Sequence, residues 1–153
     1  MAIDYPVKLD IRLTPIWHNN PPIINIGIND NIENIILSDN RTFHYEFIAN
    51  NTSTLTIELL NKTDADTIPD KGLDKAVIIE SISFFGISDP RFIWMGIYEP
   101  RYPEPWYSEQ AIPPEPLLKN YTYLSWNGKW TLTFTVPVFT WIHRVQNLGW
   151  IYD

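Results

Sequence analysis

Strict alternation of apolar and polar side chains is the feature that most limits what this chain can fold into. From residue 7 to residue 13, valine, leucine and isoleucine alternate with lysine, aspartate and arginine. The same period of two returns at residues 42–47, 54–59 and 130–136. Because successive side chains of a strand point to opposite faces, each segment predicts a strand with one buried and one solvated face.

Short polar turns separate these segments. Clusters of asparagine, aspartate and serine stand at residues 29–31, 38–40 and 50–53, a spacing typical of β-sandwiches and barrels. Asn127-Gly128 tolerates positive φ at both positions, so it predicts a two-residue hairpin between residues 124–126 and 129–132. No window has a clear helical period. We therefore predict an all-β fold of antiparallel strands, in one domain over residues 1–153.

Charge and composition narrow the classes of partner. The net charge is -7 and no run of basic residues is present, which argues against nucleic acid as a partner. The chain has no cysteine, so disulfides, zinc-thiolate sites and thiol nucleophiles are excluded. The first residues lack the basic start and apolar stretch of a secretory signal peptide, and no segment has the length of a membrane span.

Residues 90–116 are rich in proline, tyrosine and tryptophan. Prolines remove ladder donors, so the segment predicts a long loop or arm, a feature that usually has a function. Aromatic side chains there and at the predicted hairpin are candidates for stacking on sugars or for a protein interface, with Trp94 also a candidate for the core. These candidates are Trp94, Tyr98, Tyr102, Trp106, Tyr107, Trp126 and Trp130. Arg91 and Arg101 flank the cluster and serve either interpretation.

The last residues are large and apolar, with no polar tail. Trp150 and Tyr152 lie in this segment. Exposed apolar ends favour burial against a partner, so the sequence predicts self-association into a filament, a tube or a virion.

Residues 55–86 indicate a strand, a polar loop and a second strand. The loop carries Asn61, Asp64, Asp66, Asp70 and Asp74. Calcium takes 6–8 oxygen ligands, and this density of side-chain oxygens could supply several of them. A solvated acidic loop explains the same composition equally well.

The same residues resemble the calcium-dependent carbohydrate-binding modules, which are jelly-roll β-sandwiches that bind xylan-type and related sugars. The likeness lies in Asn61 and in the stretch from Gly72 to Gly86, about a fifth of the chain. It implies a lectin-like jelly-roll sandwich, a Ca²⁺ ion, a polysaccharide partner, and Asp74 and Glu80 as acidic residues of the site. Two positions depart from the family: Lys62 replaces its first aspartate, and Ala76 replaces an asparagine.

Catalytic signals are weak. His18, His44 and His143 lie in separate segments, and none stands at the sequence spacing of a metal-binding helix or a catalytic triad. Glu99 and Glu104 are the carboxylates that a small glycoside-active enzyme could use. We expect instead a non-enzymatic sugar binder that self-assembles outside the cell or in a virion. The alternative is a purely structural virion or filament subunit with no sugar affinity. The whole chain is also similar, without a diagnostic motif, to small proteins found with phages.

Overall fold

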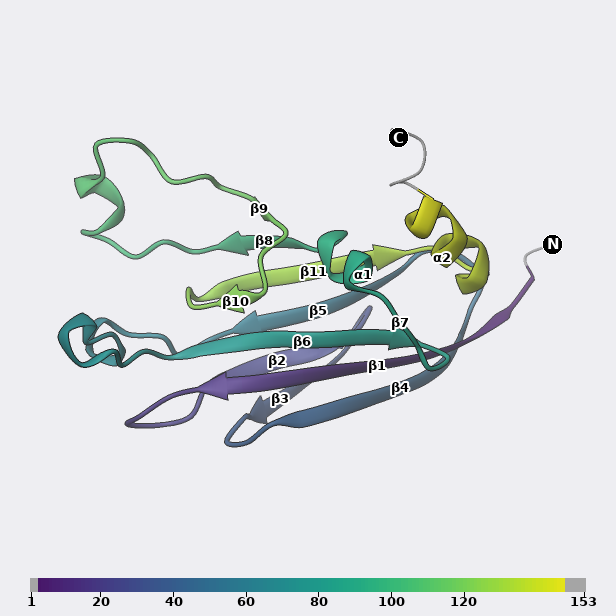
Figure 1. The fold of residues 1–153 in the computed structure, drawn as a ribbon, viewed down its shortest axis with the longest axis horizontal. Coiled ribbons are helices and arrows are strands. Elements are labelled where there is room, and N and C mark those ends of the chain that lie inside the picture. The colour runs from purple at the N-terminus through teal and green to yellow at the C-terminus, as the bar shows by residue number, and fades with distance from the viewer. Residues whose placement is uncertain (1–2, 148–153) are drawn as a thin grey trace.

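The computed structural model describes residues 3–147, which form a sandwich of two antiparallel sheets (Figure 1). In order across the first sheet lie β10 (Tyr123–Leu124), β6 (Ala76–Phe84), β1 (Tyr5–Ile16) and β4 (Arg41–Ala49), with β7 (Ile87–Ser88) paired to the end of β6. Across the second lie β3 (Asn31–Ile36), β2 (Ile23–Ile28), β5 (Ser53–Leu59), β11 (Gly128–Phe134), β8 (Ile97–Pro100) and β9 (Leu118–Lys119). The predicted all-β sandwich is confirmed.

The alternating segments form the core as predicted. In β1, Val7, Leu9, Ile11 and Leu13 are buried, and the residues between them face outward. The strand β1 pairs with β4 on one side and with β6 on the other, so it lies in the interior of its sheet. Its row of buried apolar side chains faces the second sheet. The predicted strands at 42–47, 54–59 and 130–136 coincide with β4, β5 and most of β11.

Two α-helices correct the prediction that the chain has none. The first, α1 (Pro90–Trp94), begins after Asp89, whose side chain accepts a hydrogen bond from the backbone of Arg91. The second, α2 (Val138–Asn147), buries one apolar stripe against the core. That stripe consists of Val138, Trp141, Ile142 and Val145. This spacing is helical, but the β-branched and aromatic residues that carry it favour strands by propensity.

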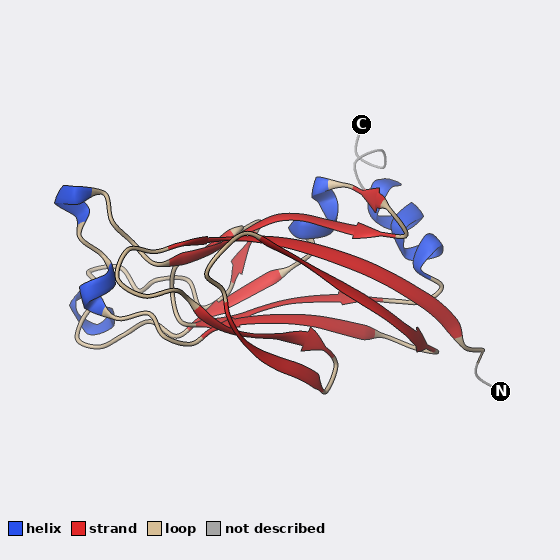
Figure 2. Cartoon of the chain, turned by 90° about the horizontal axis from the view of Figure 1, so that it is seen from below, coloured by secondary structure: helices blue, strands red, loops and turns tan. Residues whose placement is uncertain are grey.

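The three short 3₁₀ helices lie in loops at the opposite end of the sandwich from α1 and α2 (Figure 2). Two of them, η1 (Asp64–Asp66) and η2 (Pro69–Lys71), interrupt the loop between β5 and β6. The third, η3 (Tyr107–Glu109), lies in the long connection from β8 to β9. The loops that hold most of the predicted site residues therefore gather at one end.

The predicted hairpin at Asn127-Gly128 is wrong. Leu124 pairs with Val77 in the first sheet, whereas Gly128 pairs with Leu59 and Pro100 in the second. Residues 125–127 thus cross from one sheet to the other. Gly128 has a φ of 152°, and a Cβ there would lie 2.4 Å from the carbonyl oxygen of Glu99, so the close approach of β8 requires glycine.

The predicted loop over residues 90–116 is correct only in its second part. Residues 90–94 form α1, and Ile97–Pro100 form β8 inside the six-stranded sheet. Pro100 ends β8 opposite Gly128, and the irregular loop begins at Arg101. Within residues 3–147, no helix is long and apolar enough to cross a membrane.

Candidate functional site

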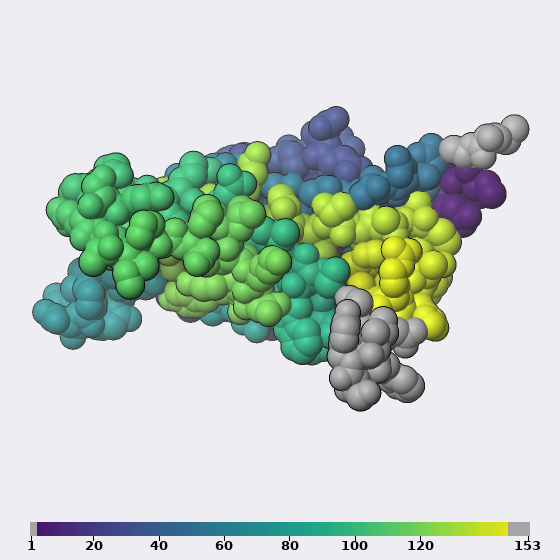
Figure 3. Space-filling view, turned by 90° about the horizontal axis from the view of Figure 1, so that it is seen from above, coloured from purple at the N-terminus to yellow at the C-terminus, as the bar shows by residue number. Residues whose placement is uncertain are grey.

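Three connections meet at the end of the sandwich away from α1 and α2: residues 60–75, residues 101–117 and residues 125–127. The first two are the teal and green segments that lie side by side at this end in Figure 3. Between them lies a cleft of about 340 Å³, called here the loop-end cleft. Its lining consists of Lys62, Thr63, Asp64, Thr67, Arg101, Pro103, Trp126 and Asn127. The cleft combines one large aromatic surface with charged and hydroxyl side chains, the usual composition of a small-ligand site.

Four aromatic rings form a contiguous group, called here the aromatic cluster, of which Trp126 lines the cleft: Tyr102, Trp106, Tyr107 and Trp126. Trp106 and Trp126 have ring centroids 4.7 Å apart, and Tyr102 lies 5.3 Å from Trp126. Tyr107 packs edge-on against Tyr102 and remains exposed. These were four of the seven aromatic candidates, and the structure brings them together.

Internal hydrogen bonds hold the proline-rich loop in place. The Tyr102 hydroxyl donates to the carbonyl of Glu115 at 2.6 Å, which closes the loop across 13 residues. The Gln110 side chain donates to the carbonyl of Trp106 at 2.9 Å, and the Ser108 hydroxyl donates to Glu104. The rings therefore project from a loop whose shape is fixed by its own contacts.

Trp126 is positioned from the opposite side. Its backbone N–H donates to the Tyr98 hydroxyl at 3.0 Å, and that hydroxyl donates to the Trp126 carbonyl. The next residue, Asn127, accepts from the backbone N–H of Lys62 at 2.7 Å and donates to the Lys62 carbonyl at 2.9 Å. This reciprocal amide pair fixes the crossing segment to the β5–β6 loop.

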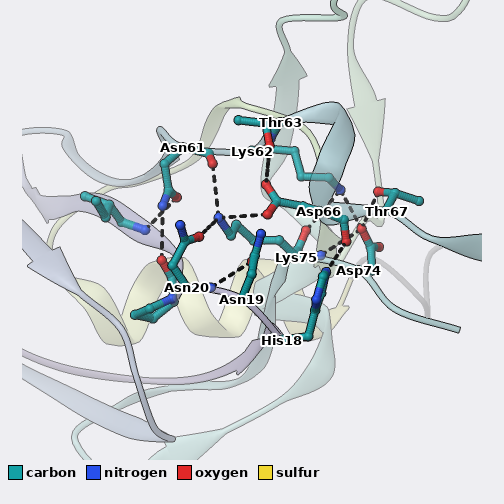
Figure 4. A network of polar contacts seen from close by, with 12 residues as sticks. His18, Asn19, Asn20, Asn61, Lys62, Thr63, Asp66, Thr67, Asp74 and Lys75 are labelled. Atoms are coloured by element: carbon teal, nitrogen blue, oxygen red, sulfur yellow. Dashed lines mark hydrogen bonds and ion pairs between the residues drawn. The ribbon is translucent and has the colours of Figure 1, made fainter. Parts of the chain in front are cut away.

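Lys62 joins the same loops through its side chain (Figure 4). Its Nζ donates to Asp74 Oδ1 at 2.6 Å, to the Ser125 carbonyl at 2.7 Å and to the Lys75 carbonyl at 3.1 Å. An ammonium group has three protons, so every donor has an oxygen acceptor. Lys62, which stands where the carbohydrate-binding modules have an aspartate, therefore has a structural role in this protein.

Lys75 forms a second, deeper cation site. Its side chain and that of Asp66 are each only 1% exposed, with Nζ 3.2 Å from Asp66 Oδ1. The same Nζ donates to Asn20 Oδ1 and, at 3.2 Å, to the Asn61 carbonyl. Burying an ion pair is costly unless its polar atoms find partners, and Asp66 Oδ1 has the ion pair with Lys75 but no hydrogen bond. Asp66 also accepts from the backbone and hydroxyl of Thr63.

The ion pairs determine how the nearby groups titrate. Burial acts to raise the pKa of Asp74, but hydrogen bonds from Lys62, Thr67 and the Lys75 backbone outweigh it, so the pKa lies below its usual value. The pKa of Asp66 is lowered in the same way, against burial, with its largest hydrogen bond from Thr63. Burial and the bond to Asp74 raise the pKa of Tyr123 to about 12.

The predicted metal ligands are only partly brought together. Asp66 and Asp74 belong to the lysine network, whereas Asp64 and Asp70 are exposed. Glu80 is exposed in the middle of β6, at the bulge where it has no cross-strand partner in β1. It therefore lies outside the β5–β6 loop. Asn61 uses its side chain on the Ile23 N–H and the Pro21 carbonyl. Within residues 3–147, no three His, Cys, Asp or Glu side chains gather as a metal site.

Three aromatic predictions need correction. Tyr98 and Trp130 are fully buried, so they belong to the core and not to a binding surface. Trp94, the candidate for the core, is 54% exposed at the end of α1. Tyr98 and Trp130 are buried because both occupy inward-facing positions of β8 and β11. Trp94 is exposed because it is the last residue of the short helix α1.

The remaining predicted residues lie elsewhere. Arg91 pairs with Asp89, with Nη2 2.9 Å from Oδ2, and donates to the Gln146 carbonyl, so it links α1 to α2. Arg101 lines the cleft and pairs with Glu58 at 2.8 Å. Trp150 and Tyr152 lie outside the described residues.

The two carboxylates considered for glycoside chemistry have other surroundings. Glu99 is exposed on β8 opposite Lys129 of β11, and Glu104 accepts the Ser108 hydroxyl before η3. Residues that sequence reasoning missed are Lys75 and Asn127, which hold the site together. The signal available in the sequence was the density of asparagine and aspartate in three loops. Their side-chain oxygens need hydrogen-bond donors, and nearby lysine and asparagine side chains can supply them.

Comparisons with known proteins give one structural likeness. No family model matches the chain, and no curated protein matches it. A solved structure described as "vCBM60 in complex with galactobiose" superposes with a TM-score of 0.43 at 10% identity. The superposition covers 82% of this chain and 96% of that chain. That solved structure is a carbohydrate-binding module.

Proposed function

We propose that this protein is a carbohydrate-binding β-sandwich that holds a polysaccharide segment in the loop-end cleft. The observation that carries the proposal is the aromatic cluster, in which Trp126 lines a cleft beside Asp64 and Arg101. Sugar rings have apolar C–H faces and polar hydroxyl edges. A site for them therefore needs an aromatic surface with hydrogen-bonding side chains around it.

The geometry meets both needs. The half-buried rings of Trp106 and Trp126 are tilted by 44° to each other, so they offer two differently oriented faces at one end of the molecule. Asp64, Thr63 and Arg101 supply an acceptor, a hydroxyl and a guanidinium at the rim. The loop is ordered by its own bonds, so binding does not have to order it. We also propose that the protein acts outside the cell or at a virion surface.

A pair of tryptophan variants tests the proposal. Trp106→Ala removes one ring of the aromatic cluster. We expect it to reduce the retardation of the protein in polysaccharide-containing native gels and to raise the Kd obtained from that retardation by at least about tenfold. Trp94→Ala removes an exposed tryptophan at the end of α1, outside the lining of the cleft, and serves as the matched control. Equal retardation of the two variants, or no retardation of the wild type by any of a panel of polysaccharides, overturns the proposal.

A second candidate function is assembly of copies of this chain into a larger structure. The observation that favours it is the open side of the sandwich, where β3 and β4 are both edge strands. Ile32, Ile36 and Ile48 are exposed on these strands, and neither strand has an interior proline to block pairing. The candidate partner is therefore a second copy that pairs edge to edge.

Sedimentation velocity tests the assembly. If copies pair along β3, the wild type sediments as an oligomer and Ile36→Lys sediments as a monomer, because a charge at the strand edge opposes pairing. Ile112→Lys, at an exposed isoleucine in the β8–β9 loop, is the control. A wild type that stays monomeric at the highest soluble concentration contradicts the assembly.

A further inference from the structure

We propose that the ammonium groups of Lys62 and Lys75 take the place of the calcium ion that the sequence resemblance implies, so that the loop-end cleft is built without a divalent cation. The inference deepens the proposed function, on which its link to sugar binding rests. The statement about calcium itself rests only on the contacts of the β5–β6 loop.

Each ammonium group lies in a cage of oxygens like the one a hard cation prefers. Lys62 Nζ contacts one carboxylate oxygen and two backbone carbonyls. Lys75 Nζ contacts one carboxylate oxygen, one side-chain amide oxygen and one backbone carbonyl (Figure 4). Calcium sites in proteins use these same three types of ligand. Here the protein supplies the positive charge covalently.

The charges in the network already balance. Asp66 and Asp74 carry two negative charges, and Lys62 and Lys75 carry two positive charges. A calcium ion in either cage would have to displace an ammonium group and leave it buried beside a doubly charged ion. For Lys75, whose side chain is 1% exposed, no solvated position is within easy reach.

The remaining carboxylate oxygens are also engaged. Asp74 Oδ2 accepts from the Tyr123 hydroxyl at 3.0 Å, and Oδ1 accepts from Thr67 at 2.9 Å and from the Lys75 backbone at 2.8 Å. Asp66 Oδ2 accepts twice from Thr63. Calcium needs 6–8 oxygens, and these oxygens become ligands only if the existing network breaks. The residues present therefore fit two lysine side chains and do not fit calcium.

The network reaches the aromatic cluster through Lys62. Its Nζ holds the Ser125 carbonyl, and its backbone pairs with the side chain of Asn127. Trp126 lies between these two attachment points. Lys62 is thus a positioning residue for the ring that lines the loop-end cleft, a role that a structural cation could fill in its absence.

Thermal unfolding in calcium and in chelator tests the inference without any sugar. A calcium ion present at one hundred times its Kd would raise the Tm of a domain this size by roughly 5–10 °C. We expect the same Tm in millimolar calcium and in EDTA, and no saturable terbium luminescence. A Tm that rises in calcium, with terbium binding that Asp74→Asn abolishes, overturns the inference.

A lysine variant tests the positive half of the claim. Lys62→Met removes the ammonium group but keeps the aliphatic stem, so we expect the Tm in EDTA to fall by at least about 5 °C because Asp74 loses its partner. Lys129→Met, at an exposed lysine on β11, is the control and should leave the Tm unchanged. Equal Tm values for both variants contradict a role for Lys62. Because neither readout involves sugar, a failed sugar assay and a failed calcium assay remain distinguishable.

Discussion

Single side chains hold together the end of the molecule where the cleft lies, and most of them are polar. Lys62, Lys75 and Asn127 connect loops that are far apart in the sequence and that have few apolar residues to pack. Sequence patterns indicated the acidic loop but not its partners. The sequence alone does not distinguish an aspartate that binds calcium from one that pairs with lysine, because the difference depends on which residues the neighbouring loops bring close.

Acidification tests the same ion pairs at the residue scale. The pKa values of Asp66 and Asp74 are lowered in the fold, because hydrogen bonds to the carboxylates outweigh the effect of burial. The pKa of Asp89 is lowered mainly by hydrogen bonds from Arg91. A lowered folded pKa adds stability above the unfolded value, about 3.9, and that stability is lost as the pH falls through the folded pKa.

We therefore expect the Tm to change little between pH 7 and about pH 5 and to fall steeply below about pH 4. Asp74→Asn should make the decrease in Tm on acidification smaller, because one of the titrating groups is gone. Asp39→Asn, in an exposed turn, should reproduce the wild-type profile. Differential scanning calorimetry at stepped pH measures the profile. A Tm that rises on acidification contradicts the ion-pair network.

The strands were the most predictable elements and the helices the least. Alternation is a local signal, so β1, β4, β5 and β11 could be predicted from their own residues. The strands β8 and β9 are short and pair only with distant segments, so their own residues gave no signal. The Asn127-Gly128 turn was misassigned because the Asn127 side chain bonds to the β5–β6 loop, which is a tertiary contact.

The helix α2 has a measurable role in closing the core. Trp141 contacts Phe84, Phe92 and Phe134, with ring centroids 5.3, 5.5 and 6.0 Å away. We expect Trp141→Ala to lower the free energy of unfolding by about 3–5 kcal/mol, because a large buried ring is removed. Thr140→Ala, at the exposed neighbouring position, should stay within about 0.5 kcal/mol. Urea unfolding of both variants checks this, and similar losses would contradict the packing role of α2.

At the scale of the whole molecule, the sandwich separates two tasks. The end with α1 and α2 closes the core with aromatic side chains, and the loops at the opposite end line the loop-end cleft. The fold class could be predicted because it depends on the periodicity of many residues. The site could be predicted only as a set of aromatic and acidic candidates, since its geometry depends on where three loops meet.

Calorimetric titration with the polysaccharide that retards the protein most, in EDTA and again in calcium, tests the central claim most directly. The proposed lysine network predicts saturable binding with the same Kd in both buffers. Binding that appears only in calcium would contradict the role given to Lys62 and Lys75, and no binding in either buffer would contradict carbohydrate recognition by the loop-end cleft.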